Sequence, residues 1–313
     1  MTSEDAVPVS DLQAALGDLD VHDVLHGDAA RILFASGNLS RVFGVRTRAG
    51  DDVVVKIRPD SARLDDVFAV QVALAGQGLP VPAPVRGPVR ADGVAVSVER
   101  LVPGGATRGP GPGAARAFAD VLHRLIRSAP PAGDHPGLHV DEPAWVAWGH
   151  GGASLWPARD DAGTPIDGPG PDDVDEAGAA ARSVLRSLER PVVIGHGDFE
   201  DQNLRWNGDA IHAVHDWDSL IAQPECAIVG GAAAIWPAGV VAWCATPGEV
   251  AEFLGAYETV RGQAFDEDER RAAWAAALWQ RAFNARKHAA DGGGMQLDLF
   301  RRDADELRRH AGC

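Results

Sequence analysis

Basic residues are scarce in this sequence, and acidic residues outnumber them. The 313 residues include 29 Lys and Arg against 45 Asp and Glu, which gives a formal net charge of −16. Proteins that bind nucleic acid neutralise phosphates with clustered basic side chains, and no such clusters occur here. We therefore exclude nucleic acid as a partner and expect that a cationic small molecule would suit the acidic chain better.

Cysteine is also scarce, which argues against a disulfide framework. The three cysteines, Cys226, Cys244 and Cys313, have neither paired spacing nor the C-x-x-C pattern of metal and redox sites. The first ten residues, MTSEDAVPVS, lack the basic and apolar regions of a secretory signal. We expect a reduced, cytoplasmic protein.

One long stretch contains no charged residue and has the length of a membrane span. It runs from Cys226 to Thr246 and consists mainly of Ala, Gly and Val. Pro237 interrupts it, and acidic residues flank it at Glu225 and Glu249 without a basic anchor. This pattern predicts a buried core helix with a bend or break, and no association with a membrane.

Lysine is the rarest of the basic residues. Only Lys56 and Lys287 among the 29 are lysines, so arginine supplies almost every positive charge. Lys56 follows Val53-Val54-Val55, a run of β-branched residues that predicts a strand. A lysine at such a position suggests a site that needs a compact ammonium group, which guanidinium cannot replace.

The N-terminal third of the chain has the pattern of a small mixed sheet and helix. Apolar spacing predicts a leading helix within residues 10–30, capped by Ser10 or Asp11. Strands are predicted at 32–34, 42–45 and 53–57 in a three-stranded antiparallel sheet, followed by a helix over 61–77 and a strand over 94–98. The turn at 35–38 contains Gly37, whose loop could present backbone N–H groups to a phosphate that Lys56 also reaches.

The remainder of the chain is predicted to be largely helical. The break Pro103-Gly104-Gly105 marks a boundary between lobes at 1–102 and 103–313. Helices are predicted at 114–127, 174–188, 227–245, 247–260 and 270–290. The irregular segment 129–173 carries tryptophans at 145, 148 and 156, which we assign to the core, with a substrate pocket as the alternative.

The stretch from Val192 to Leu220 holds the clearest functional pattern. Residues 192–194 and 211–214 are predicted strands on either side of a polar loop at 195–203. The loop contains Asp198 and Asn203, and Asp216 follows the second strand. These side chains offer oxygen ligands for a hard cation, or a carboxylate base.

Several segments resemble the aminoglycoside phosphotransferase family, the small-molecule branch of the protein-kinase-like fold. Residues 196–203, HGDFEDQN, are similar to its catalytic loop, and residues 216–218, DWD, to its metal-binding D-W-[DE] motif. Residues 55–57 resemble its nucleotide-binding strand, 78–82 its turn after the N-lobe helix, and 97–101 its hinge strand. Together these matches cover roughly residues 32–230, and the first two motifs are the specific ones.

The resemblance implies an α+β fold with two lobes. The N-lobe, 1–102, would carry an antiparallel sheet with a helix and bind the nucleotide, and the larger, mainly helical C-lobe, 103–313, would carry the catalytic loop. The implied cofactors are Mg²⁺ and ATP or GTP, and the implied partner is a small molecule with a hydroxyl group. The resemblance leaves the acceptor open between an aminoglycoside, a macrolide and a housekeeping metabolite, and the protein open between a monomer and a homodimer.

The resemblance also implies roles for individual residues. Asp198 would be the base that takes the proton of the acceptor hydroxyl. Asn203 and Asp216 would hold Mg²⁺, and Lys56 would contact the α- and β-phosphates. His196 would brace the loop. Further nucleotide contacts would come from Gly37, Ser40, Glu99 and Leu101.

The sequence departs from the family pattern at two places. Val67 stands where the family helix carries the glutamate that pairs with the lysine, so Asp65 or Asp66 is expected to replace it. The G-D-P…D-L segment of the family appears here as Ala222–Ile228, without the aspartates. These differences indicate a divergent member. Glu200 and Asp201 add negative charge to the loop, which favours a cationic acceptor.

Two alternatives to a kinase remain open at this stage. The first is a non-catalytic, pseudokinase-like protein that binds a nucleotide or another ligand on the same fold. The second is a metal-dependent hydrolase that uses His196, His212, His215 and Asp216 as ligands. The spacing of His212 and His215 on a predicted strand weakens it, because side chains three residues apart point to opposite faces.

Overall fold

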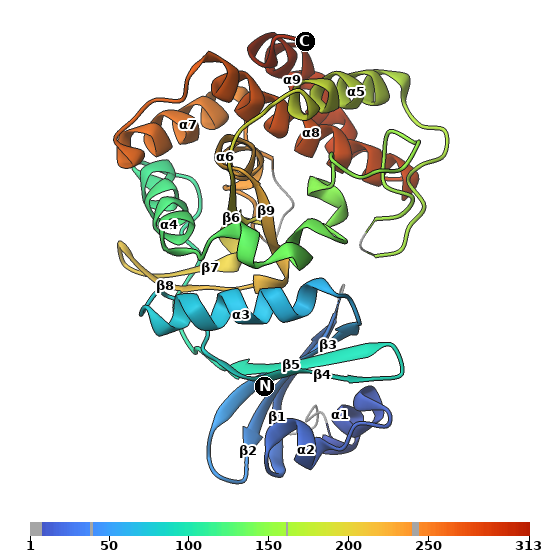
Figure 1. The fold of residues 1–313 in the computed structure, drawn as a ribbon, viewed down its shortest axis with the longest axis vertical. Helices are drawn as coiled ribbons and strands as arrows, with labels where there is room; N and C mark the ends of the chain where they lie inside the picture. The colour runs from blue at the N-terminus through green and yellow to red at the C-terminus, as the bar shows by residue number, and fades with distance from the viewer. Residues whose placement is uncertain (1–7, 38–39, 161, 240–243) are drawn as a thin grey trace. The chain divides into compact units, whose positions relative to one another are not determined.

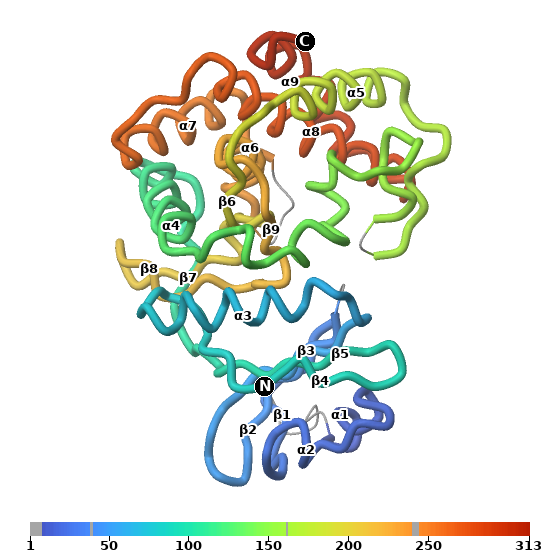
Figure 2. The backbone as a smooth tube through the Cα atoms, viewed as in Figure 1, coloured from blue at the N-terminus to red at the C-terminus, as the bar shows by residue number. Residues whose placement is uncertain are grey.

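The chain divides into two compact units. The computed structural model describes residues 8–37, 40–160, 162–239 and 244–313 (Figures 1 and 2). The N-terminal unit contains Met1–Gly104 and His135–Asp141, and the C-terminal unit contains Gly105–Asp134 and Glu142–Cys313. The first unit is built on a sheet and the second is mainly helical, which confirms the predicted α+β class.

The N-terminal unit contains a five-stranded antiparallel sheet in the order β1-β2-β3-β5-β4. Its strands are β1 (Ala29–Gly37), β2 (Arg41–Thr47), β3 (Asp52–Pro59), β4 (Pro84–Ala91) and β5 (Val94–Arg100). The predicted three-stranded sheet therefore had too few strands. Strand β4 was missed because Pro84 and Pro88 argue against a strand, yet β4 lies at the sheet edge, where proline is tolerated.

The predicted turn over 35–38 was also wrong in part. Residues 35–37 still belong to β1 and pair with β2, while Asn38 lies outside the described residues.

The helices of this unit are α1 (Val9–Leu16), α2 (Val21–Leu25) and α3 (Arg63–Gly76). The predicted single leading helix was wrong, because the chain leaves helical geometry at Gly17, which has φ 61°. Neither Ser10 nor Asp11 is the N-cap, since α1 begins directly after Pro8. Helix α3 ends before Gly78, whose φ of 75° is easily reached by glycine.

The two faces of the sheet carry different kinds of side chain. One face packs against α1 and α2 and forms a core from Leu12, Leu16, Val24, Ile32, Phe43, Val45, Val53, Val55, Ile57, Val96 and Val98. Each fully buried side chain of this size contributes about 1.5–3 kcal/mol to folding. Lys56 alternates with these residues along β3 and therefore points to the opposite face. There Lys56 lies across from Ser97, and Val54 lies across from Glu99.

Helices make up most of the C-terminal unit (Figure 1). They are α4 (Ala114–Ser128), α5 (Asp172–Arg186), α6 (Glu225–Ile235), α7 (Pro247–Arg261), α8 (Glu267–Ala290) and α9 (Met295–Ala311). Short 3-10 turns occur at 132–134, 144–146, 201–203 and 217–219, and one at 136–139 belongs to the N-terminal unit. Helix α9 was not predicted, although Phe300, Leu307 and Ala311 have helical spacing and are buried. Of the three tryptophans assigned to the core, Trp156 is buried, and Trp145 and Trp148 are half-buried.

Helix α6 replaces the longer helix predicted over 227–245. It ends at Ile235, two residues before Pro237, as expected for a helix that a proline terminates. All of its residues from Cys226 to Ile235 are buried, which confirms a core helix. Residues 240–243 lie outside the described residues. Within the described residues, every helix is too short or too polar to cross a bilayer.

Two small sheets flank the polar loop of the C-terminal unit. Strand β6 (Val192–His196) pairs with β9 (Leu220–Pro224), and β7 (Leu204–Asn207) pairs with β8 (Ala210–Val214). The predicted unit of two strands around one loop was incomplete. The turn at Asn207-Gly208, with φ 62° at Gly208, closes a hairpin between β7 and β8, and β6 pairs with β9 instead of β8.

The close contact between α6 and α8 depends on small residues. Helix α8 presents a buried run of alanines, and Gly230 of α6 lies directly against the backbone of Ala273. A Cβ at position 230 would collide with the carbonyl group of Ala273. By contrast, a Cβ at the adjacent Gly231 would meet no atom within 4 Å. Only one of the two glycines is therefore required for packing.

We predict that Gly230→Ala lowers the free energy of unfolding by about 1–3 kcal/mol, because two buried helix backbones must move apart. Gly231→Ala is the matched control, and it should be neutral or slightly stabilising, since alanine has the higher helix propensity. Thermal and urea unfolding of both variants measure the difference. Equal melting temperatures for the two variants would contradict this account of the contact.

Candidate functional site

The polar loop begins where β6 ends, and backbone hydrogen bonds fix its first residue. The amide N–H of Gly197 donates to the carbonyl of Ser219 at 2.7 Å. The carbonyl of Gly197 accepts a hydrogen bond from the indole N–H of Trp145 at 2.9 Å. A side chain at position 197 would also press on the Ser219 carbonyl, 3.0 Å from its Cβ. Glycine thus allows the loop to pass close to the segment before β9.

His196 is buried and holds together two parts of the site. Its Nε2 lies 2.9 Å from the carbonyl oxygen of His215, and its Nδ1 lies 3.2 Å from the amide nitrogen of Asp198. A carbonyl only accepts and an amide N–H only donates, so Nε2 carries the proton and Nδ1 is the acceptor. Since both ring nitrogens are occupied in this way, the geometry favours a brace over a proton acceptor.

Asp198 is oriented by Asn203. The side-chain amide of Asn203 donates to both the backbone carbonyl and the carboxylate Oδ2 of Asp198, each at 2.9 Å. The backbone carbonyl of Asn203 accepts the N–H of His215 at 2.8 Å. Because the amide nitrogen is directed at Asp198, the amide oxygen of Asn203 lies on the other side of its planar group. Asn203 thus links the loop to the end of β8.

Asp216 occupies an unusual backbone conformation directly after β8. Its φ of 60° and ψ of 52° are left-handed, which costs a non-glycine residue on the order of 1 kcal/mol. Aspartate is one of the residues that tolerate this region. The hydroxyl of Ser219 donates to its Oδ2 at 3.0 Å. The structure therefore fixes both the backbone and the carboxylate of Asp216.

Asp201 has a structural function that the sequence did not indicate. Its carboxylate is buried and accepts the backbone N–H groups of Arg108 at 2.8 Å and of Gly109 at 3.0 Å. Its own N–H donates to the carbonyl of Trp236 at 3.1 Å. This carboxylate therefore anchors the loop to the segment before α4, and its effect on a cationic acceptor stays a prediction.

Glu200 carries a carboxyl group whose pKa is strongly shifted. The pKa of Glu200 is raised to about 9, mainly because the carboxyl group is buried and secondly because Asp198 is charged. The charges of Asp216 and Asp201 raise it further. The amide of Gln202 donates to the Glu200 carboxylate and opposes the rise. Several carboxyl groups thus repel one another at this place. A divalent cation would relieve that repulsion.

The chemistry of these residues suits a magnesium ion. Asn203 and Asp216 supply the amide and carboxylate oxygens that Mg²⁺ prefers, and phosphate oxygens and water usually complete its shell. Within the described residues, His, Cys, Asp and Glu side chains do not gather in any group of three or more that could hold a metal ion. The set proposed for a hydrolase, His196, His212, His215 and Asp216, is therefore not assembled as a metal site.

In the N-terminal unit, the predicted nucleotide contacts are spread along the sheet. Gly37 ends β1, and Ser40 directly precedes β2. Leu101 follows β5, and its N–H donates to the carbonyl of Asp52 at 3.0 Å. The roles of these residues and of Glu99 in nucleotide binding stay predictions.

The partner of Lys56 differs from the one that the sequence suggested. The ammonium of Lys56 lies 3.2 Å from Oε1 of Glu99. Asp65 instead pairs with Arg90 at 2.9 Å, and Asp66 accepts the N–H of Gly137 at 2.6 Å. The expectation that Asp65 or Asp66 would replace the missing helix glutamate was therefore wrong. The sequence could not show this, because the pair depends on strand register.

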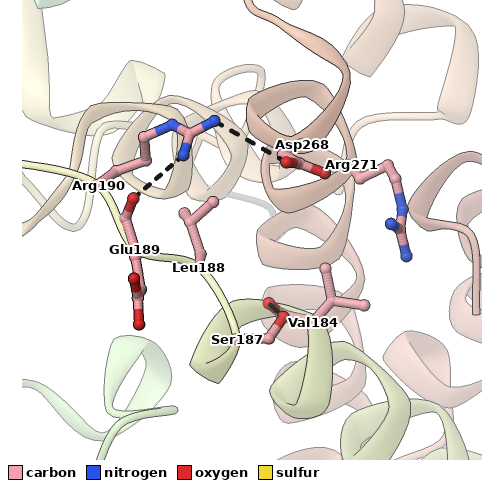
Figure 3. A pocket seen from close by; sticks show the side chains of 7 residues that line it. All are labelled: Val184, Ser187, Leu188, Glu189, Arg190, Asp268 and Arg271. Atoms are coloured by element: carbon pink, nitrogen blue, oxygen red, sulfur yellow. Dashed lines mark hydrogen bonds and ion pairs between the residues drawn. The ribbon is translucent and has the colours of Figure 1, made fainter.

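A surface hollow of about 220 Å³ lies elsewhere in the C-terminal unit, between the end of α5 and the start of α8 (Figure 3). Its lining includes Arg190, which pairs with Asp266 at 2.8 Å and lies 4.0 Å from Asp268. These ion pairs join the two elements and account for the charged lining. The hollow contains none of the predicted site residues.

Comparison with known proteins identifies a family. The family model described as "Phosphotransferase enzyme family" matches residues 31–225. No curated protein matches the chain. Among solved structures, the amicoumacin kinase hAmiN, in complex with AMP-PNP, Ca²⁺ and Ami, has a TM-score of 0.64 and 13% identity, with 96% of each chain covered.

Two further structures have the same fold. The aminoglycoside phosphotransferase APH(4)-Ia has a TM-score of 0.61 and 13% identity, with 97% of this chain and 99% of that chain covered. A choline/ethanolamine kinase family protein from Mesorhizobium loti has a TM-score of 0.55 and 17% identity, with 97% and 98% covered. Together with the elements found within each unit, these likenesses confirm the protein-kinase-like fold.

The raised pKa of Glu200 predicts a specific pH dependence of stability. Between about pH 4.5 and 9 the folded chain holds a proton that the unfolded chain has released. Stability from this group therefore falls as pH rises through that range, by at most about 1.4 kcal/mol per pH unit. Glu200→Gln cannot titrate, so the free energy of unfolding of the wild type should fall relative to that of the variant between pH 5.5 and 8.5.

Urea unfolding in EDTA, at both pH values, measures this difference. Glu267→Gln, at an exposed position of α8, is the control and should differ from the wild type equally at both pH values. A difference between the wild type and Glu200→Gln that does not change with pH would contradict the prediction.

Proposed function

Since the chain belongs to the phosphotransferase enzyme family and is a small-molecule phosphotransferase, we propose that it transfers the γ-phosphate of ATP or GTP to a hydroxyl group of its acceptor. The observation that carries this proposal is the fixed carboxylate of Asp198. Asn203 holds that carboxylate, and His196 holds its backbone N–H. A base needs such an orientation before the acceptor arrives.

In the proposed reaction, the residues of the loop handle the acceptor. The hydroxyl group donates to the Asp198 carboxylate, which orients its oxygen and takes its proton as the new O–P bond forms. The bond between the γ-phosphorus and its bridging oxygen breaks, and ADP or GDP leaves with the electron pair. His196 takes no part in the proton transfer and keeps the loop in place.

The remaining assignments concern the phosphate donor. We propose that residues 1–102 bind the nucleotide, with Lys56 on its α- and β-phosphates and with contacts from Gly37, Ser40, Glu99 and Leu101. Asn203 and Asp216 would hold Mg²⁺, which, when bound, neutralises charge on the phosphate oxygens. The AMP-PNP and Ca²⁺ in the complex of hAmiN support a nucleotide and a divalent cation.

For the acceptor, we propose a cationic compound of the antibiotic type. Its support is the carboxylates of Asp198 and Asp216, which lie close enough to act on Glu200, together with the net charge of −16. The related structures include ternary complexes with hygromycin B and with Ami, and a spectinomycin phosphotransferase with ADP and spectinomycin. The likeness to a choline/ethanolamine kinase family protein adds small amino alcohols to the classes worth testing.

The test is a phosphotransfer assay with ATP and GTP against aminoglycosides, macrolides, amino sugars and amino alcohols. We predict that Asp198→Asn lowers kcat by about 10²–10⁴-fold, because the hydroxyl loses its proton acceptor. The melting temperature of this variant should still rise when Mg²⁺ and nucleotide are added, since the donor site is intact.

Asp209→Asn, at the exposed tip of the β7–β8 hairpin, is the matched control and should retain full activity. A wild type that transfers phosphate to none of the acceptors and gains no thermal stability from either nucleotide would refute the proposal. An active Asp198→Asn variant would refute the role of Asp198.

A further inference from the structure

Lys56 and Glu99 form a buried ion pair on one face of the sheet. Their side chains are 10% and 9% exposed, and Lys56 Nζ lies 3.2 Å from Glu99 Oε1. Glu99 lies across from Val54 on β5, two residues from Lys56 along β3, so the two side chains share a face and meet diagonally. Charges this deeply buried are stable only when their positions and hydrogen bonds are well defined.

Gln71 of α3 fixes the other side of the glutamate. Its amide Nε2 donates to Oε2 of Glu99 and to the carbonyl of Pro82, both at 2.9 Å. Both protons of the amide are thereby used, and Gln71 itself is buried. One carboxylate oxygen thus contacts the ammonium of Lys56, and the other contacts the helix. The three side chains form a continuous chain from α3 to β3.

The acidic residues of α3 are engaged elsewhere. Asp65 binds Arg90, and Asp66 binds Gly137 and His135. Val67, which the resemblance aligns with the glutamate of the family, is buried. Gln71 follows Val67 by four residues, so both lie on the same side of the helix. The helix therefore approaches Lys56 through an amide and an intermediate carboxylate.

We propose that Glu99 is the positioning residue for Lys56 and that Gln71 couples this pair to helix α3. The proposal rests on the phosphate-binding role of Lys56 in the proposed function. A lysine side chain has four rotatable bonds, so its ammonium group can occupy many positions. Glu99 confines the ammonium group of Lys56 to one position before a nucleotide binds. The strand that supplies the hinge thus also supplies the acid that the helix lacks.

Nuclear magnetic resonance can observe this pair directly, because the chain contains only two lysines. With ¹³C-labelled lysine, two ε-carbon signals are expected, one from Lys56 and one from Lys287, which lies 3.4 Å from Asp160 in the other unit. Lys287→Arg assigns them. Glu99→Gln should move the Lys56 signal and leave the Lys287 signal in place, which also shows that the fold is intact.

Kinetics then test the positioning role. In Glu99→Gln the KM for the nucleotide should rise and kcat should fall, with kcat/KM lower by about 100-fold, while the KM for the acceptor stays unchanged. Gln71→Met leaves the ion pair but removes the amide, so both effects should be smaller. This second variant keeps the test decisive should Glu99→Gln not fold.

Asp65→Asn is the matched control, because it removes an α3 carboxylate that binds Arg90 instead. It should change neither the Lys56 signal nor the KM for the nucleotide. An active wild type whose Lys56 signal and kinetics are unaffected by Glu99→Gln would overturn the positioning role alone. A wild type without phosphotransfer would overturn the proposed function, while the lysine signals would still report whether Glu99 holds Lys56.

Discussion

The site around Asp198 in the C-terminal unit depends on Asn203, which forms hydrogen bonds to both the loop and the end of β8. Its side chain holds the carboxylate of Asp198, and its backbone carbonyl holds the N–H of His215, next to Asp216. His196 makes a parallel connection between the same two segments, from the N–H of Asp198 to the carbonyl of His215. The loop and the end of β8 are therefore cross-linked twice, and the acidic side chains keep their places despite their mutual repulsion.

Because these carboxylates repel one another, the loop needs hydrogen bonds to the surrounding structure that hold it in place. Trp145 fixes the carbonyl of Gly197, and Asp201 receives two backbone N–H groups from the segment before α4. Without such anchors, carboxyl groups this close would separate or bind protons. The raised pKa of Glu200 reflects its burial and the repulsion by neighbouring carboxylates. A cation held by these side chains, as proposed, would reduce that repulsion.

The N-terminal unit also contains buried charge, which it balances with an ion pair between two strands. A single lysine on a buried sheet face needs an acid, and the acid comes from the adjacent strand β5. Asp66 of α3 instead binds Gly137 and His135, which belong to the segment His135–Asp141 of the same unit. Each helix carboxylate therefore has one defined use. The contact of α3 with the ion pair is made by the neutral side chain of Gln71, which donates to Glu99.

The sequence alone determined the parts of this protein that depend on local spacing. The strand before Asp198, the interval from Asp198 to Asn203 and the turn at Asn207-Gly208 all act over a few residues, so their pattern indicates both the local structure and the family. The run of β-branched residues from Val53 to Val55 likewise placed Lys56 on a strand. Loop chemistry of this kind is visible in the sequence, because it is set by the residue types themselves.

Only the tertiary structure decided which distant residues meet. Strand register pairs Lys56 with Glu99, β6 with β9 rather than with β8, and the edge strand β4 with β5 in spite of its prolines. The docking of α3 sends Asp66 to Gly137, and the folding of the loop sends Asp201 to the backbone before α4. These contacts follow from how whole elements pack and which buried polar groups must be satisfied, and that requirement has no counterpart in the spacing of residues along the chain.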